Sequence, residues 1–129
     1  MSDLKNIGLT GESTTAARGL LSALSIADLK DVARLGFAYA VVHDERPVRD
    51  SSAGDWSFTA GANFNVATID DAHGSLRELV AILHPEVGDE PYRAIETLMN
   101  VGIIRLAEDV RVGNVTVLSD LLSLQSSEE

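Results

Sequence analysis

The sequence predicts a mainly α-helical protein with four to five helices and a short strand at its N-terminus. Three observations support this fold class. Apolar residues recur at helical spacing in several separate stretches. One short stretch near the N-terminus alternates instead, as strands do. Hydrophobic residues make up 45% of the 129 residues, which is enough for a core, and this length predicts a single domain over residues 1–129.

Residues 28–44 are expected to form the central helix. Their second half, residues 35–42, is apolar on every face, and a helix of that kind is normally buried. A short apolar run can also be a buried strand. The helix is favoured because Ser25 and Asp28 form a weak capping box, and because Pro47 stops the run soon afterwards.

Gly36 lies inside this expected helix, although glycine lowers helix stability. We therefore expect another backbone to pack closely against it. The predicted core residues are Leu35, Phe37 and Val41 in this helix and Leu98 in a later one.

The remaining elements follow from periodicity and from residues that start or end helices. Ile7 and Leu9 alternate in a short strand over residues 5–10. A helix capped by Ser13 or Thr14 is expected to end near residue 24, and a loop at 44–61 is expected to be held to the core by Trp56 and Phe58. An extended piece at 64–68 and a helix capped by Asp70 or Asp71 that ends at 83 should follow. The last expected elements are a helix at 92–110 after Pro91, a strand at 112–117 and a helical turn at 120–124. Residues 1–6 and 125–129 are expected to be frayed ends.

Composition limits the possible functions. The formal net charge is −10, from 10 basic and 20 acidic residues. Free-standing nucleic-acid binders carry a basic patch, so this balance argues against tight DNA binding by the chain alone and suits a basic partner. Cysteine is absent, which excludes disulfides and thiolate catalysis and fits a cytoplasmic protein. We expect no membrane contact, because the longest apolar run, residues 35–42, is too short to span a bilayer. We expect no secretory signal, because the N-terminal residues MSDLKN lack a basic region followed by an apolar one.

Residues capable of chemistry do not form a recognised constellation, so we predict no catalytic, cofactor-binding or metal-binding residues. His43 lies at the end of the central helix, where the helix dipole favours a cation. Asp70 and His73 have the spacing of two metal ligands, but the third and fourth ligands of a zinc site are missing. No phosphate-binding glycine loop occurs. A small enzyme that uses His43 or His73 is one hypothesis for function.

A strand followed at once by two helices is the order of ribbon-helix-helix proteins, whose paired strands enter the major groove of DNA. The expected strand offers no arginine that could read guanine. The basic residues near this start, and the candidate nucleic-acid contacts, are Lys5, Arg18, Lys30 and Arg34. A DNA-binding regulator of this type is a second hypothesis.

Four stretches between about residue 7 and residue 111 carry a family resemblance. They are IGLT at 7–10, VARLGFAYA at 32–40, GANFN at 61–65 and NVGIIRL at 100–106. Together they resemble the DndE family, the small helical accessory proteins of DNA phosphorothioation systems. The second stretch is similar to the family's A-R-x-A-F-x-Y-S helix, and the last falls where the family has a His-Gly-Leu pattern. The resemblance implies a compact helical subunit that acts as an oligomer beside sulfur-transfer enzymes on DNA.

The leading hypothesis is therefore a non-catalytic accessory subunit of a DNA-modification or phage-defence complex. Some DndE-like proteins have been proposed to bind nicked DNA through lysines, and this chain has only Lys5 and Lys30, so we expect weak or indirect DNA contact. Larger subunits of such a system, and copies of this chain in a dimer or tetramer, are the expected partners. We expect the N-terminal strand to be unpaired along both edges, which invites pairing with a second copy. Alternatively, residues 112–117 return to pair with residues 7–9.

Overall fold

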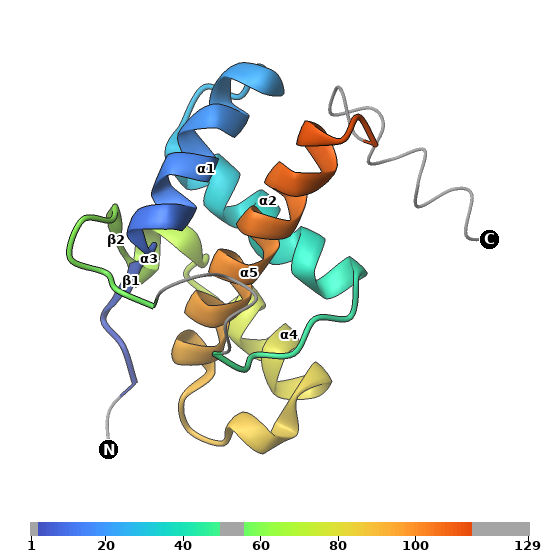
Figure 1. Cartoon of the computed structure of the whole chain (residues 1–129). Coiled ribbons are helices and arrows are strands. Elements are labelled where there is room, and N and C mark those ends of the chain that lie inside the picture. Colours follow the sequence, from blue (N-terminus) through green and yellow to red (C-terminus); the bar gives the residue numbers. More distant parts are fainter. Residues whose placement is uncertain (1–2, 50–55, 115–129) are drawn as a thin grey trace.

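The computed structural model describes residues 3–49 and 56–114 (Figure 1). This part of the chain is mainly helical and has one short antiparallel pair of strands near its N-terminus, which confirms the predicted fold class. The elements in chain order are β1 (Asn6–Gly8), α1 (Gly11–Ala23), α2 (Leu29–Val42), β2 (Asn63–Asn65), α3 (Val66–Ile69), α4 (Ser75–Leu83), the 3-10 helix η2 (Pro85–Val87) and α5 (Pro91–Arg111).

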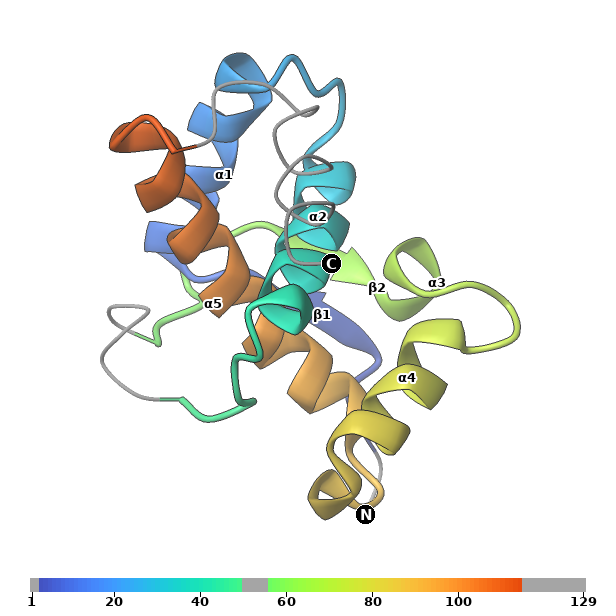
Figure 2. The same ribbon diagram turned by 90° about the vertical axis from the view of Figure 1, so that its right-hand side faces the viewer.

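Helix α5 lies at the centre of the fold. It crosses α2 in the most extensive contact of the molecule and also packs against α1, α4 and β1, as the two views in Figure 1 and Figure 2 show. Its residues 94–103 are buried without interruption. The helix that is buried on every side is therefore the middle of α5, and the expectation that residues 35–42 hold that position is wrong.

Helix α2 is buried on one side only. Phe37 is 2% exposed and Leu98 is fully buried, as predicted. Leu35 and Val41 are only partly buried at the edge of the core, and Val42 is 41% exposed. The reason is that α1 and α5 cover one side of α2, whereas the short helices α3 and α4 cover the other side only in part.

The crossing of α2 and α5 depends on two glycines. A Cβ atom on Gly102 would lie 1.7 Å from the carbonyl oxygen of Gly36, and a Cβ atom on Gly36 would lie 2.9 Å from the carbonyl oxygen of Met99. No side chain fits between two backbones at that separation. This confirms the prediction that another backbone packs closely against Gly36.

The N-cap residues of both helices in the N-terminal half differ from those predicted. Thr10, rather than Ser13 or Thr14, caps α1 by accepting the backbone N–H of Ser13 at 3.0 Å. Ser25 does not start α2. It has a φ of 56° and ends α1, because the N–H of the following Ile26 donates back to the carbonyl oxygen of Leu21 at 2.9 Å. Helix α2 begins four residues after Ser25.

Two other predicted elements differ from the structure. The extended piece expected at 64–68 ends at Asn65, and α3 begins at the next residue. Residues 112–114, where the predicted strand at 112–117 would begin, form a turn instead. The reason is that Gly113 has a φ of 85° and ends α5. Residues 115–117, the helical turn at 120–124 and the frayed end at 125–129 lie outside the described residues.

Acidic side chains outside α4 and α5 bind the N–H groups at the starts of these helices. Asp70 accepts the N–H groups of Leu76 at 2.9 Å and Arg77 at 3.3 Å, so the predicted acidic cap of α4 is present although the helix begins only at Ser75. Asp3 accepts the N–H of Tyr92 at 2.6 Å in the first turn of α5. This contact ties the described part of the N-terminal segment to α5.

Candidate functional site

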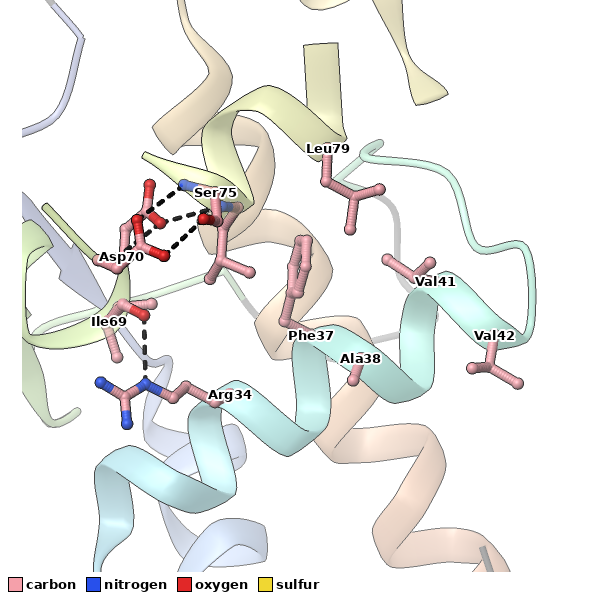
Figure 3. A pocket seen from close by; sticks show the side chains of 11 residues that line it. Arg34, Phe37, Ala38, Val41, Val42, Ile69, Asp70, Ser75 and Leu79 are labelled. Atoms are coloured by element: carbon pink, nitrogen blue, oxygen red, sulfur yellow. Dashed lines mark hydrogen bonds between the residues drawn. The ribbon is translucent and has the colours of Figure 1, made fainter. Parts of the chain in front are cut away.

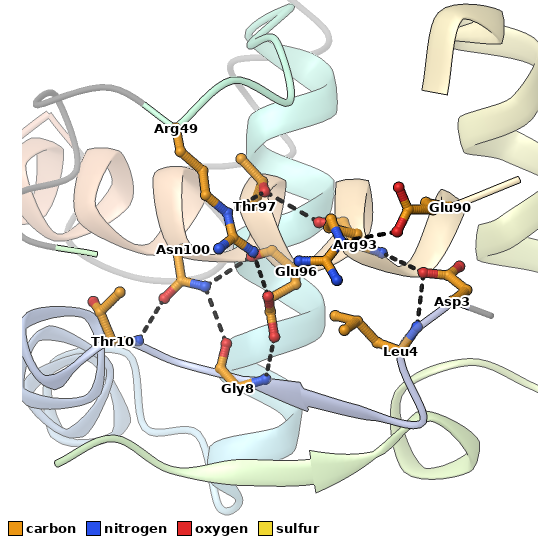
Figure 4. Close-up of polar contacts among 10 residues, drawn as sticks. All are labelled: Asp3, Leu4, Gly8, Thr10, Arg49, Glu90, Arg93, Glu96, Thr97 and Asn100. Atoms are coloured by element: carbon orange, nitrogen blue, oxygen red, sulfur yellow. Dashed lines mark hydrogen bonds and ion pairs between the residues drawn. The ribbon is translucent and has the colours of Figure 1, made fainter. Parts of the chain in front are cut away.

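Strand β1 is bound within the chain along both of its edges (Figure 4). One edge pairs antiparallel with β2. On the other edge, the N–H of Gly8 donates to the Glu96 carboxylate at 2.8 Å, and the N–H of Thr10 donates to the Asn100 side-chain oxygen at 2.8 Å. The expectation of a strand unpaired along both edges is therefore wrong. The contacts of the described residues also leave no edge of β1 for residues 112–117.

Asn100 is fully buried on α5 and connects this helix to β1. Its amide nitrogen donates to the carbonyl oxygens of Gly8 at 3.1 Å and Glu96 at 2.7 Å, while its oxygen accepts from Thr10. An amide suits this position because it both donates and accepts hydrogen bonds. Every buried side-chain nitrogen and oxygen in the described ranges has a hydrogen-bond partner. The cluster thus fixes the strand and leaves no polar atom for a ligand.

The same cluster anchors the loop between α2 and β2. Arg49 pairs with Glu96 at 2.5 Å and donates to the hydroxyl of Thr97 at 3.2 Å. Its guanidinium carbon lies 5.2 Å from the ring centroid of Trp56 and 5.1 Å from that of Phe58, within the range of cation–π contacts. Arg49 is thus the residue that joins the loop to α5, and Trp56 and Phe58 pack on Arg49. Direct contact of the two aromatic residues with the apolar core stays a prediction.

Sequence reasoning did not single out Glu96 or Asn100. The available signal was their position, because they stand four residues apart on a helix whose neighbouring residues are apolar. Two polar residues at that spacing share one face of a helix. Such a pair inside an apolar stretch indicates that the helix packs against a backbone segment or a charged side chain with which the two residues form hydrogen bonds.

The four candidate nucleic-acid residues are exposed, and they come from three parts of the chain. Lys5 precedes β1, Arg18 lies on α1, and Lys30 and Arg34 lie on α2. Arg34 has partners of its own. It donates to the carbonyl oxygens of Ile69 at 3.2 Å and Thr68 at 2.5 Å, and it lies 3.4 Å from Asp31. Arg34 thus caps the C-terminal end of α3 and has little capacity left for a phosphate.

The histidines have local structural contacts. The ring of His43, just after α2, lies 4.3 Å from the ring of Tyr39 between centroids. The backbone N–H of His73 donates to the Asp71 carboxylate at 3.0 Å in the loop before α4. In the described ranges, no three side chains of the His, Asp and Glu type gather in a way that could hold a metal ion.

Tyr39 and Asp109 connect α2 to the end of α5. The Tyr39 hydroxyl donates to the Asp109 carboxylate. Burial, followed by this hydrogen bond and by the negative charge of Asp109, raises the pKa of Tyr39 well above its ordinary value. The phenol therefore stays neutral at physiological pH and acts as a hydrogen-bond donor that joins the two helices.

A groove lies between α2 and the α3–α4 segment (Figure 3). Its volume is about 450 Å³. Seven apolar and four polar residues line it, namely Phe37, Ala38, Val41, Val42, Ile69, Leu76 and Leu79, and Arg34, Asp70, Asp71 and Ser75. Arg34, Asp70 and Ser75 lie at the α3 end together with Ile69, and Val41, Val42 and Leu79 form the opposite, apolar end.

The polar end of the groove is already occupied by hydrogen bonds within the chain. Asp71 accepts from the N–H of Ser75 at 3.0 Å and from its hydroxyl at 2.5 Å, and these bonds hold the pKa of the Asp71 carboxyl below its ordinary range. Asp70 accepts from the start of α4 and from the Tyr92 hydroxyl at 2.8 Å. The groove therefore offers apolar surface rather than free catalytic groups. The sequence did not predict it.

The fold and this surface together define a small helical protein with an internally bound N-terminal strand and an apolar groove between α2 and α4. Comparison of the chain with protein-family models, with curated proteins and with solved structures finds no match. Within residues 3–49 and 56–114, no helix is both long enough and apolar enough to cross a membrane.

Proposed function

We propose that this chain is a non-catalytic accessory subunit of a DNA-modification or phage-defence complex, of the kind that the DndE family supplies to DNA phosphorothioation systems. One observation carries the proposal. The four stretches that resemble that family, distant from one another in the sequence, are in direct contact in the fold.

The contacts among the four stretches are made by backbone atoms and by small or amide residues. Asn100, at the start of the last stretch, binds Gly8 in the first. Gly102 in the last stretch contacts Gly36 in the second. The N–H of Leu9 in the first donates to the carbonyl oxygen of Ala62 in the third at 2.9 Å. These contacts join the four stretches into one framework, so the resemblance supports a common fold and assembly role rather than a common catalytic step.

Charge supports protein contacts over direct DNA binding. Acidic residues outnumber basic ones two to one, at 20 to 10. Affinity for a duplex depends on lysines and arginines that displace counterions from phosphates, and here Arg34 is already bound to α3. A larger subunit with a basic surface is the partner that this charge fits.

Co-expression with the sulfur-transfer subunits of a DNA phosphorothioation system tests the proposal. We expect the chain to co-purify with a tagged subunit in a fixed ratio that nuclease treatment does not change, because the contact is protein to protein. A chain that never co-purifies, or that leaves the complex once DNA is digested, would refute the accessory role.

A salt titration with nicked and intact duplex tests the regulator hypothesis. We expect weak binding of both at physiological salt. Tight binding that is lost when Lys5, Arg18, Lys30 and Arg34 are changed to alanine together would favour a DNA-binding regulator instead. The observed structure gives that hypothesis no separate support, because both edges of β1 are occupied.

A further inference from the structure

The apolar end of the groove between α2 and α4 continues onto exposed apolar side chains. Val42 and Leu79 line the groove and are themselves partly exposed. Ile82 and Leu83 follow Leu79 by one helical turn, and Ile82 is 77% exposed. Contiguous exposed apolar area of this kind marks a surface that another segment covers.

The sequence supplies a matching segment after the last described residue, Asn114. Residues 115–124 read VTVLSDLLSL. At about 3.6 residues per helical turn, the apolar residues of this segment share one half of the helix surface and the polar residues share the other. The apolar half comprises Val115, Val117, Leu118, Leu121, Leu122 and Leu124, and the polar half comprises Thr116, Ser119, Asp120 and Ser123.

The end of α5 lies next to one wall of the groove. Asp109, five residues before Asn114, accepts a hydrogen bond from Tyr39 on α2. Val42 follows Tyr39 by three residues and is therefore its neighbour on the surface of α2, and Val42 lines the groove. A ten-residue helix is about 15 Å long, which is close to the length of the nine-residue α4 along the groove.

We propose that residues 115–124 of this chain bind in the α2–α4 groove as an amphipathic helix. The leucines of the segment cover Val41, Val42 and Leu79, and its serines face the solvent. The inference concerns the chain alone and does not depend on the proposed function. A second copy of the chain, which could cover the same surface, is an outcome that the test distinguishes.

Disulfide cross-linking tests the proposal, because the chain contains no cysteine of its own. Ala38→Cys in the groove is combined with Leu121→Cys, and the control combines Ala38→Cys with Ser119→Cys on the polar half. A disulfide forms only when the two Cα atoms come within about 7 Å. We expect the Leu121 pair to oxidise at least ten times faster than the Ser119 pair and to give a product of monomer mass. Equal rates, or a disulfide between two chains, would overturn the proposal, and the latter would favour a second copy.

An independent test uses a dye that fluoresces on exposed apolar surface. In the full chain, Leu121→Asp with Leu122→Asp should release the segment and raise dye fluorescence several-fold, with an unchanged far-ultraviolet circular dichroism signal from the described helices. The matched control, Ser119→Asp with Ser123→Asp, adds the same charge on the polar half and should leave the fluorescence as it is. A rise in both variants, or in neither, contradicts the docking of this segment.

Discussion

Replacement of Gly102 by alanine is the sharpest perturbation that the structure offers. The new Cβ would stand 1.7 Å from the carbonyl oxygen of Gly36 and 3.2 Å from the Cβ of Ala40. Ordinary van der Waals contact begins at 3.4 Å, which exceeds the distance of 1.7 Å to the Gly36 oxygen by about 1.7 Å. The backbones of α2 and α5 would have to separate by about this amount. Neither backbone can turn aside as a flexible side chain can.

The cost of that separation can be set against the gain in helix propensity. Alanine in place of a helical glycine gains about 1 kcal/mol. Overpacking of a core costs typically about 1–3 kcal/mol and sometimes more, and even a gap of about 0.5–1 Å forfeits a quarter to a half of each dispersion contact. The crossing of α2 and α5 is the largest contact in the fold. With a cost at the upper end of that range and a gain of about 1 kcal/mol, we expect Gly102→Ala to lower the free energy of unfolding by about 2 kcal/mol.

Urea unfolding followed by far-ultraviolet circular dichroism measures this change, with Gly19→Ala as the matched control. Gly19 is exposed in α1, and a Cβ there would meet nothing within 4 Å. The same substitution should there raise the free energy of unfolding by about 0.4–1 kcal/mol. The reasoning fails if Gly102→Ala is as stable as the native chain, or if the two alanine variants shift in the same direction.

Three further predictions use the same assay. Phe37→Ala should cost about 3–5 kcal/mol because the Phe37 side chain is buried in the core, whereas Lys30→Ala on the exposed side of α2 should change stability by no more than about 0.5 kcal/mol; similar losses would contradict the burial of Phe37. Asn100→Ala leaves buried backbone groups of β1 without partners and should cost about 1–3 kcal/mol for each, and a neutral result would show that β1 does not need this contact. The raised pKa of Tyr39 means that the folded chain keeps this proton to higher pH than the unfolded chain. The stabilisation from this bound proton is complete below the pKa of about 10 that tyrosine has in the unfolded chain, and it is lost as pH rises beyond that value. Tyr39→Phe should therefore lose less stability between pH 9 and pH 11 than the unchanged chain does. An equal loss in the two proteins would show that the Tyr39–Asp109 contact does not form.

Predictions from the sequence were correct where one residue type serves a single local purpose. Gly36 in an apolar helix indicated a close backbone, because no other residue tolerates that approach, and the structure places Gly102 there. Pro91 marked the start of α5 because its missing N–H is not needed in the first turn.

Predictions failed where two residues compete for the same local role. Ser25 has the side chain of a helix cap, yet it adopts a left-handed conformation and ends α1 instead. Ser13 and Thr14 can both cap a helix, but Thr10 precedes them in an extended conformation, and its hydroxyl is the one that accepts. These choices depend on where the chain must turn to pack its helices, and periodicity in sequence does not contain that information.

The sequence by itself determined the class of fold, the order of a strand and two helices at the start, the close approach at Gly36 and the acidic balance of charge. These follow from residue spacing, from backbone sterics and from composition, which act over a few residues or over the whole chain. Only the tertiary structure decided the partner of β1, because Glu96 and Asn100 lie about ninety residues away from the strand they bind. It also decided which helix is buried on every side and where the apolar groove lies, because both depend on how α3, α4 and α5 pack around α2.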